Sequence, residues 1–502
     1  MHVDVLIVGA GFGGSLLAQI LQQSGKRVLL IEKGMHPRFA MGESTSPLTN
    51  LLLETFAARY DLPHLLNIAT WGAWKQTLPD LGVGLKRGFT YYGHAGDGTQ
   101  HVAENILAVA ASPGDACADT HWLRSDVDAW LCSQAIDLGV IYRDQTTLRD
   151  AVSVDTKWEC LIDVAGGIEE MWTADFLVDA GGRSSTLGPM VGLKQAPFEN
   201  YPDTVALYSH FDHVGLAASE LSLATKELPP YPLDWSALHH VFPGGWMWVL
   251  RFDNNRVSAG VSVERWLADA IDLFGDGGWE RLLERLPSVK AQFKDAVRTL
   301  PWMESQALPI CLDRCAGQVN GAGWALLPSA TAFIDPLYST GFSLTLLGIE
   351  RIAAILTSRV PTEAELAKYE HTVMRDVHCV ARYVASNFAA FSDFKEFTAV
   401  SMFYFAAASW SEICRRIGKP ELADGMLLSG DASFWQSFER FKAGECTAEE
   451  AIGPWNIAGL ADAAKKGMYR ADLADVIAAA HKLGISPDVL RMEVETAEWA
   501  KC

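Results

Sequence analysis

The sequence predicts an α/β protein (α+β overall) with a Rossmann-type domain, an antiparallel sheet and a helical C-terminal region. Three observations support this prediction. An apolar run and a glycine-rich turn open the chain. Strand-like runs follow between about residues 200 and 300, and strand signals become rare after Gly341, where Ala, Leu, Arg and Glu are dense. Such a change of pattern along the chain is typical of separate layers or domains.

The N-terminal pattern has the order strand, glycine turn, helix, strand and acid. An apolar run over residues 3–8 leads into the turn and an amphipathic stretch over residues 15–23. A second apolar run over residues 27–32 ends in Glu32. This order is the fingerprint of a dinucleotide-binding unit, and it is far more specific than the glycine spacing alone.

Three glycines of the turn have a physical role. Gly9 permits the tight turn, Gly11 lets the backbone approach a pyrophosphate, and Gly14 lets the helix pack close to the strand. The helix N-terminus favours phosphate groups, and the acid suits ribose hydroxyls but repels the 2′-phosphate of NADP. We therefore expect a nucleotide site at Gly9, Gly11, Phe12, Gly13, Gly14, Glu32 and Lys33.

Composition excludes several classes of function. The net charge of −20 argues against nucleic acid and anionic membrane surfaces as partners. We find no apolar run long enough for a membrane span, and the early glycine turn leaves no room for a signal peptide, so a cytoplasmic protein is expected. The nine Cys are scattered without a CxxC pair, which predicts reduced thiols and no metal site.

At 502 residues the chain suits two or three domains. The runs at 204–208, 246–250 and 257–263 have strand character, and a turn precedes the last of them. We interpret them as an antiparallel sheet on the substrate side. The predicted division is a discontinuous nucleotide-binding domain over 1–195 and 300–360, the sheet over 196–299, and a helical region over 361–502.

Three later segments have residues that could bind the rest of an extended cofactor. Arg124, with Asp128 in the helix that follows, can hold a diphosphate or a ribityl chain, although a surface ion pair is the simpler alternative. The small residues around Asp179 and Gly181 permit close backbone approach. Residues 333–341 lead into a helix whose first amides can bind an anion. Together with the first turn, these segments resemble the FAD-binding fold of the flavin monooxygenase superfamily over about residues 1–360.

Within that superfamily, residues 36–47, 238–249, 333–341 and 391–394 resemble flavin-dependent halogenases, the phenol-acting branch more than the tryptophan-acting branch. The loop at Gly42 and the Trp-x-Trp stretch are the more specific matches. The resemblance implies cofactor contacts from Gly42, Glu43, Ser44, Arg124, Asp179, Gly181, Asp335 and Gly341, halide binding by Thr340 and Gly341, and a substrate pocket with Trp246, Trp248, Tyr338 and Phe391.

Lys86 occupies the position of the family's essential lysine. In that chemistry reduced FAD and oxygen form a hydroperoxide, halide attacks its distal oxygen, and the lysine holds the hypohalous acid or forms a haloamine. Burial would lower the pKa of such a lysine and make it nucleophilic. The alternative is a surface lysine beside Arg87, with Arg87 as the true match.

The expected partners and the alternative functions depend on a second nucleotide turn that we do not find and on Arg251. We find no second glycine-rich nucleotide turn, so reduced flavin is expected from a separate flavin reductase. A phenolic or similarly electron-rich aromatic is the expected substrate; its attachment to a carrier protein, the choice of chloride or bromide, and a homodimer are left open. Arg251 stands where the family motif has Pro, which keeps two alternatives: a flavin-dependent aromatic hydroxylase and a catalytically decayed flavin-binding protein.

Overall fold

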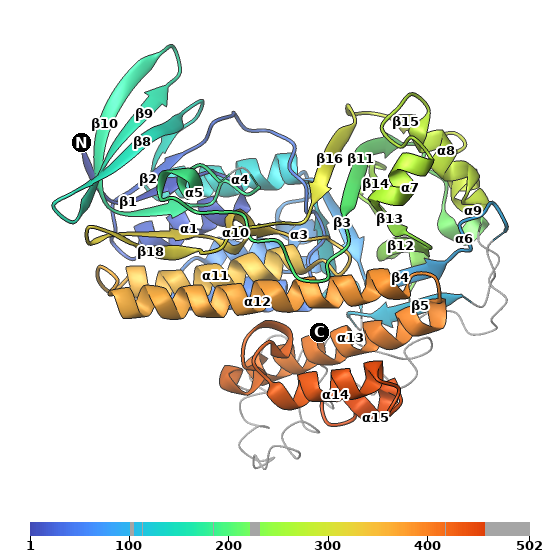
Figure 1. Ribbon diagram of the computed structural model, residues 1–502. Helices are drawn as coiled ribbons and strands as arrows, with labels where there is room; N and C mark the ends of the chain where they lie inside the picture. Colours follow the sequence, from blue (N-terminus) through green and yellow to red (C-terminus); the bar gives the residue numbers. More distant parts are fainter. Residues whose placement is uncertain (101–104, 113, 184, 221–230, 417, 457–502) are drawn as a thin grey trace.

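The computed structural model describes residues 1–456 except 101–104, 113, 184, 221–230 and 417. The predicted helical region therefore lies outside the described residues from position 457 on. Two sheets stand side by side, and long helices run beneath both of them (Figure 1). The predicted α/β fold is confirmed.

The first sheet contains eight strands within the described residues. Its central strands are parallel and almost fully buried because helices cover the faces. The parallel strands, in spatial order, are β7 (Ile141–Arg143), β2 (Val28–Ile31), β1 (His2–Val8), β10 (Ile168–Asp179) and β19 (Ala322–Leu326). Antiparallel pairing adds β18 (Ala316–Val319) to β19, and β9 (Lys157–Val164) with β8 (Thr147–Val154) to β10.

Three helices bring their N-terminal ends to this sheet. The helix α1 (Phe12–Gln23) connects β1 to β2 as the fingerprint predicts, and most of its residues are buried. It packs against α4 (Arg124–Asp137) and α11 (Thr340–Leu356). The starts of these three helices therefore come from distant parts of the sequence and meet near one region of the fold.

The second sheet also contains eight of the strands that the structure describes. Its strands pair antiparallel except for β4 with β12, which are parallel. The strands predicted over 204–263 form its centre. The spatial order is β15 (Val297–Arg298), β11 (Thr204–Asp212), β14 (Val257–Glu264), β13 (Gly245–Arg251), β12 (Ala237–Phe242), β4 (Gly88–Gly93) and β5 (Ile106–Ala110), with β16 (Met303–Leu308) also paired to β11.

Three strands of this sheet come from outside residues 196–299. They are β4 and β5, from the predicted first domain, and β16, from the segment that returns to it. Pairing between strands so distant in sequence leaves no local signal, which is why the sequence pattern did not reveal it. The exact division into domains stays a prediction.

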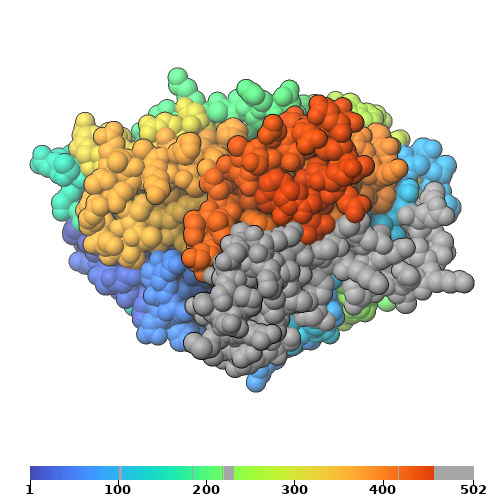
Figure 2. Space-filling model, turned by 90° about the horizontal axis from the view of Figure 1, so that it is seen from below, coloured from blue at the N-terminus to red at the C-terminus, as the bar shows by residue number. Residues whose placement is uncertain are grey.

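The helical region begins with α11 and continues through α12 (Glu363–Ala390) and α13 (Phe394–Arg416). A capping box starts α12: the Thr362 side chain accepts from the Glu365 amide, and the Glu365 side chain accepts from the Thr362 amide. Seen from below, the orange to red residues of this region cover much of the visible face (Figure 2). Among the described residues, no helix is long and apolar enough to cross a lipid bilayer.

The remaining elements are short or connect the two sheets. A small two-stranded sheet, β3 (Val83–Lys86) with β6 (Asp119–Trp122), carries the predicted lysine. The helices are α2 (Pro47–Tyr60), α3 (Trp71–Thr77), α5 (Leu187–Met190), α6 (Ala217–Glu220), α7 (Arg265–Ala270), α8 (Gly278–Glu284), α9 (Pro287–Gln292), α10 (Pro328–Thr331), α14 (Ala432–Lys442) and α15 (Ala448–Ile452), and β17 (Ile310–Cys311) pairs with β20 (Ala332–Phe333).

Candidate active site

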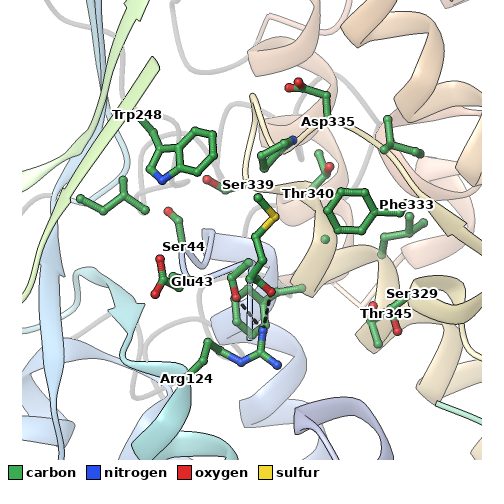
Figure 3. A pocket seen from close by; sticks show the side chains of 18 of the residues that line it. Glu43, Ser44, Arg124, Trp248, Ser329, Phe333, Asp335, Ser339, Thr340 and Thr345 are labelled. Carbon is green, nitrogen blue, oxygen red and sulfur yellow. Dashed lines mark hydrogen bonds between the residues drawn. The ribbon is translucent and has the colours of Figure 1, made fainter. Parts of the chain in front are cut away.

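A cavity of about 1100 Å³, its open mouth included, lies between the starts of α1 and α11 and the strand β13. Figure 3 shows Arg124 at one end of it and Asp335 at the other. The predicted site residues that line the cavity are Phe12, Gly42, Glu43, Ser44, Arg124, Trp246, Trp248, Asp335, Thr340 and Gly341. The predicted residues outside this lining are Gly9, Gly11, Gly13, Gly14, Glu32, Lys33, Lys86, Asp179, Gly181, Tyr338 and Phe391.

The glycine turn has no room for side chains at two positions. Gly9 has φ +98°, and a Cβ there would lie 2.8 Å from the backbone of Ala180. A Cβ on Gly14 would lie 1.9 Å from the carbonyl oxygen of Gly9. The cap residue of α1, Gly11, provides no side-chain cap, so the first amides of the helix face outward without one. This geometry suits a pyrophosphate.

Two guanidinium groups converge on the start of α1. A Cβ on Gly11 would lie 3.5 Å from Nη2 of Arg38 and 3.8 Å from Nη2 of Arg124. Nearby, Oε2 of Glu32 accepts hydrogen bonds from the amide of Ala10 at 2.9 Å and from Arg38 at 2.9 Å. Burial would raise the pKa of Glu32, but Arg38 and the amide bonds lower it below its ordinary value, so the carboxylate is charged. These charges and the open turn fit FAD.

Arg124 also fixes the loop that lines the cavity. Its guanidinium forms two 2.8 Å bonds with Asp128 and donates to the carbonyls of Met41 and Gly42 at 2.9 and 2.8 Å. The pair is buried: the Arg124 side chain is 7% exposed and that of Asp128 0%. Arg124 therefore holds α4 and the Gly42 loop together at the mouth of the nucleotide turn.

Two other predicted cofactor residues have a different environment. The carboxylate of Asp179 accepts bonds from the amides of Gly181, Thr186 and Leu187 and from the hydroxyl of Ser185. It therefore stabilises its own turn, and the backbone of that turn packs against Gly9. Lys33 is exposed to solvent.

The start of α11 forms one wall of the cavity. Its cap residue, Ser339, has φ +55° and gives no side-chain cap to the helix. Thr340 and Gly341 follow and line the cavity, and a Cβ on Gly341 would meet no atom within 4 Å. Uncapped amides at the positive end of a 17-residue helix suit a small anion.

Lys86 is fully buried at the end of β3. Its Nζ donates to the carbonyl of Thr45 and to Oγ of Ser339 at 3.4 Å, and lies 3.8 Å from the centre of the Phe89 ring. Burial lowers the pKa of Lys86 to about 7, and the charge of Asp119 opposes this shift. Lys86 is therefore no surface lysine, and one residue of the cavity wall, Ser339, touches its amine.

The neighbouring Arg87 has a charged partner of a different kind from the groups around Lys86. Its Nη1 lies 2.6 Å from Oδ1 of Asp115, whose side chain is 53% exposed. The Arg87 side chain is itself only 12% exposed, but its charge is paired with this surface carboxylate, and Arg87 is absent from the cavity lining formed by the described residues.

The two tryptophans of β13 lie against each other in the cavity wall. The ring centres of Trp246 and Trp248 are 5.5 Å apart. Nε1 of Trp246 donates to Oδ1 of Asp335 at 3.0 Å, and Nε1 of Trp248 donates to Ser258 at 3.3 Å. Burial raises the pKa of Asp335 to about 6, although the hydrogen bonds to its carboxylate oppose this. Asp335 therefore orients Trp246.

Tyr338 and Phe391 lie in an aromatic layer behind the cavity. The Tyr338 ring stacks on Tyr404 at 4.0 Å, and Phe391 packs on Phe397 at 5.8 Å. Phe397 in turn lies 5.3 Å from Tyr91. Through Tyr91 this layer reaches His239, which is part of the cavity wall.

His239 and Arg38 are two residues to which the sequence assigned no role. The His239 ring stacks on Tyr91 at 4.5 Å and lines the cavity. Burial, with the charge of Lys86, lowers the pKa of His239 to about 3, so the ring is neutral. Both residues lie in the stretches that carry the resemblance, but neither position has a local pattern that separates a wall residue from a core residue.

Arg251 does not bring a cation into the cavity. It ends β13 and donates to Oδ1 of Asp234 at 3.1 Å and to the carbonyls of Val214 and Gly215. It is absent from the cavity lining formed by described residues, whereas the preceding Leu250 is present. The departure from the family motif therefore changes how the end of β13 is anchored.

Comparisons with known proteins agree with this geometry. Residues 7–59 match the family model of an NAD(P)-binding Rossmann-like domain. The chain is 30% identical to monodechloroaminopyrrolnitrin halogenase PrnC of Pseudomonas fluorescens over 410 residues, 78% of this chain and 69% of that protein. It is 28% identical to the tetracycline 7-halogenase of Kitasatospora aureofaciens over 68% of this chain and 61% of that protein. The fold matches the structure of halogenase PltM in complex with phloroglucinol and FAD, with a TM-score of 0.76 and 23% identity over 90% of this chain and 94% of that one.

Proposed function

The chain belongs to the flavin-dependent halogenase family, and we propose that it attaches chlorine or bromine to a phenolic or similarly electron-rich aromatic. The single observation that carries this proposal is the placement of Lys86, which is fully buried and touches Ser339 of the cavity wall. Halide and reduced FAD, delivered by a separate flavin reductase, complete the set of reactants.

The nucleotide turn and its charges would hold the cofactor. The amides at the start of α1 and the guanidinium groups of Arg38 and Arg124 suit the diphosphate, and Glu32 suits the adenosine ribose. When bound, reduced FAD supplies the activated oxygen that oxidises the halide. The residues of the chain bind, orient and enclose the reactants around that chemistry.

The two walls of the cavity would separate halide from aromatic substrate. The amides of Thr340 and Gly341 suit the halide because they lie at the uncapped, positive end of α11. Trp246 and Trp248 form a rigid wall, since each indole N–H is held by a hydrogen bond. That wall would keep the aromatic ring away from the oxidising end of the cavity.

Lys86 would carry the halogen to the ring. As an amine it displaces water from hypohalous acid, RNH₂ + HOX → RNHX + H₂O, and the haloamine then reacts with the ring, RNHX + ArH → RNH₂ + ArX. As an ammonium it donates a hydrogen bond to the acid instead. A pKa of about 7 makes both forms available near neutral pH.

The surroundings of Lys86 favour a phenol over an indole. At the position where the tryptophan-acting branch has a glutamate, this chain has Tyr338, whose hydroxyl bonds to Ser401 at 2.9 Å. Burial raises the pKa of Tyr338 above its ordinary value, so it offers no base to the ring proton. A phenol needs less help, because its own deprotonation enriches the ring in electrons.

The test compares Lys86→Met with the matched control Arg87→Met in the full chain. Each protein is supplied with a flavin reductase, chloride or bromide and a panel of phenols, and products are measured by mass spectrometry. Loss of a proton-transfer or covalent group costs about 100-fold or more in rate. We expect that loss of halogenated product in Lys86→Met, with FAD affinity and reduced-flavin oxidation unchanged, and normal product in Arg87→Met.

Two results contradict the proposal. One is a wild-type product that is heavier by one oxygen atom and forms without halide, which would identify a hydroxylase. The other is halogenated product from Lys86→Met at the wild-type rate.

A further inference from the structure

Lys86 has an acidic partner directly across the small sheet. In the antiparallel pair of β3 and β6, Lys86 lies opposite Asp119. Both residues are fully buried. Side chains of directly opposed residues project from the same face of a sheet, with their Cβ atoms about 5 Å apart. The carboxylate of Asp119 and the amine of Lys86 therefore share one buried space.

The other groups that face Lys86 are neutral. His121 and His239 interact electrostatically with it, and burial, together with the charge of Lys86, lowers the pKa of each to about 3. Phe89 contributes its ring, and Thr45 and Ser339 contribute a carbonyl and a hydroxyl. Within the part of the chain that the structure describes, the acidic charge acting on this amine is that of Asp119.

The carboxylate of Asp119 is held in place from a third element. Nδ2 of Asn50, in α2, donates to its Oδ1 at 2.8 Å. The loop that leads into α2 also supplies the Thr45 carbonyl that accepts from Lys86. One segment of the chain, residues 45–50, therefore contacts both Lys86 and Asp119.

We propose that Asp119 is a positioning residue for Lys86: it directs the amine toward Ser339 and determines which form, ammonium or amine, meets the oxidised halogen. The inference rests on the proposed function, since it gives the lysine of that reaction its counter-charge. In this chain Tyr338, and not an acid, precedes the cap residue of α11. The carboxylate that faces Lys86 comes instead from Asp119 of β6. Asp119 acts through Lys86 and takes no part in bond making.

The first experiment measures the lysine directly, in the full chain without FAD or substrate. Protein labelled with ¹⁵N at lysine Nζ is titrated by NMR, and the Lys86→Met spectrum identifies the Lys86 signal. An opposite charge close to an ionisable group shifts its pKa by about one to three units. We expect the isosteric change Asp119→Asn to lower the pKa of Lys86 by about one unit or more, and the control Asp115→Asn, at the Arg87 pair, to leave it unchanged.

The second readout is the pH profile of halogenation. Its acid limb should move to lower pH in Asp119→Asn by the same amount as the NMR titration of Lys86. If that variant does not fold, Asp119→Ser removes the same negative charge and keeps a hydroxyl that can bond to Asn50, and it should lower the pKa of Lys86 in the same direction. An unchanged or raised pKa of Lys86 in Asp119→Asn, or in Asp119→Ser when only that variant folds, overturns the inference. The titration needs no turnover, so its failure can be distinguished from a failure of the Lys86→Met product assay, which tests the proposed function.

Discussion

The nucleotide turn, residues 9–14, and the lysine cluster, which we define as Thr45, Lys86, Phe89, Asp119 and Ser339, are built on opposite principles. The turn works because side chains are absent, and its members are neighbours in sequence. The cluster works because particular side chains meet, and one of its contacts joins residues 253 positions apart. The space available determines which substitutions the turn tolerates, whereas buried charge determines which substitutions the cluster tolerates. An added side-chain atom should therefore disturb the turn, whereas the removal of a charged group should alter the cluster.

The largest effect is expected from adding one methyl group to the turn. In Gly14→Ala the new Cβ would lie 1.9 Å from the Gly9 carbonyl, so the helix must move away from the strand. We expect a loss of more than about 3 kcal/mol in the free energy of unfolding, beyond ordinary overpacking, and no FAD in the purified protein. Urea unfolding and the flavin absorbance measure both. The control Gly114→Ala, where a Cβ meets nothing within 4 Å, should behave as the wild type.

Removing the charge from the cluster should have the opposite effect on stability. Because burial lowers the pKa of Lys86 to about 7 from 10.5, the folded protein binds fewer protons than the unfolded chain between these values. The cost of burying the charge is therefore complete below pH 7 and is relieved as the pH rises toward 10.5. We expect Lys86→Met to be more stable than the wild type at pH 6, with the difference shrinking by pH 10.

This comparison is made by urea unfolding at both pH values. Arg87→Met supplies the control, because its partner is exposed and its loss should give no such pH-dependent gain. A Lys86→Met protein that is less stable than the wild type at pH 6 and equally so at pH 10 would show that packing, not charge, dominates this position.

The smallest effect is expected at the end of β13, outside both regions. Arg251→Gln removes bonds to Asp234 and to two carbonyls, which we expect to cost about 1 to 2 kcal/mol of stability with halogenation unchanged. Arg256→Gln, which loses a half-exposed pair with Asp212, should cost less than about 1 kcal/mol. A changed product, in particular a hydroxylated one, would show that Arg251 acts on the reaction after all.

The contrast between the two regions also explains what the sequence could predict. The strand, turn and helix at the N-terminus follow from local steric rules, so they were predicted in order and the structure has them. The Lys86 position came from resemblance, and its burial could not have been derived, because a four-residue strand has no pattern that separates buried from exposed lysine.

The partners of Lys86 were beyond sequence reasoning for a different reason. Asp119 and Ser339 reach it through strand register and through the start of a distant helix, and neither relation leaves a local signal. Tyr338 and Phe391, expected beside the substrate, lie in the aromatic layer behind His239. The sequence indicated which residues belong to this end of the fold. Packing determined which of them line the cavity and which lie behind its wall.

The parallel pairing of β1 with β10 and the late arrival of α11 have a consequence for how the protein is made. A chain growing from its N-terminus can pack Gly9 against Ala180 once Ala180 has left the ribosome. The amine of Lys86 must wait for Ser339, which is synthesised much later. During translation the contact between Gly9 and Ala180 can therefore form well before Ser339 reaches the amine of Lys86, whereas Phe12 of the turn meets Phe342 of α11 only at that later stage.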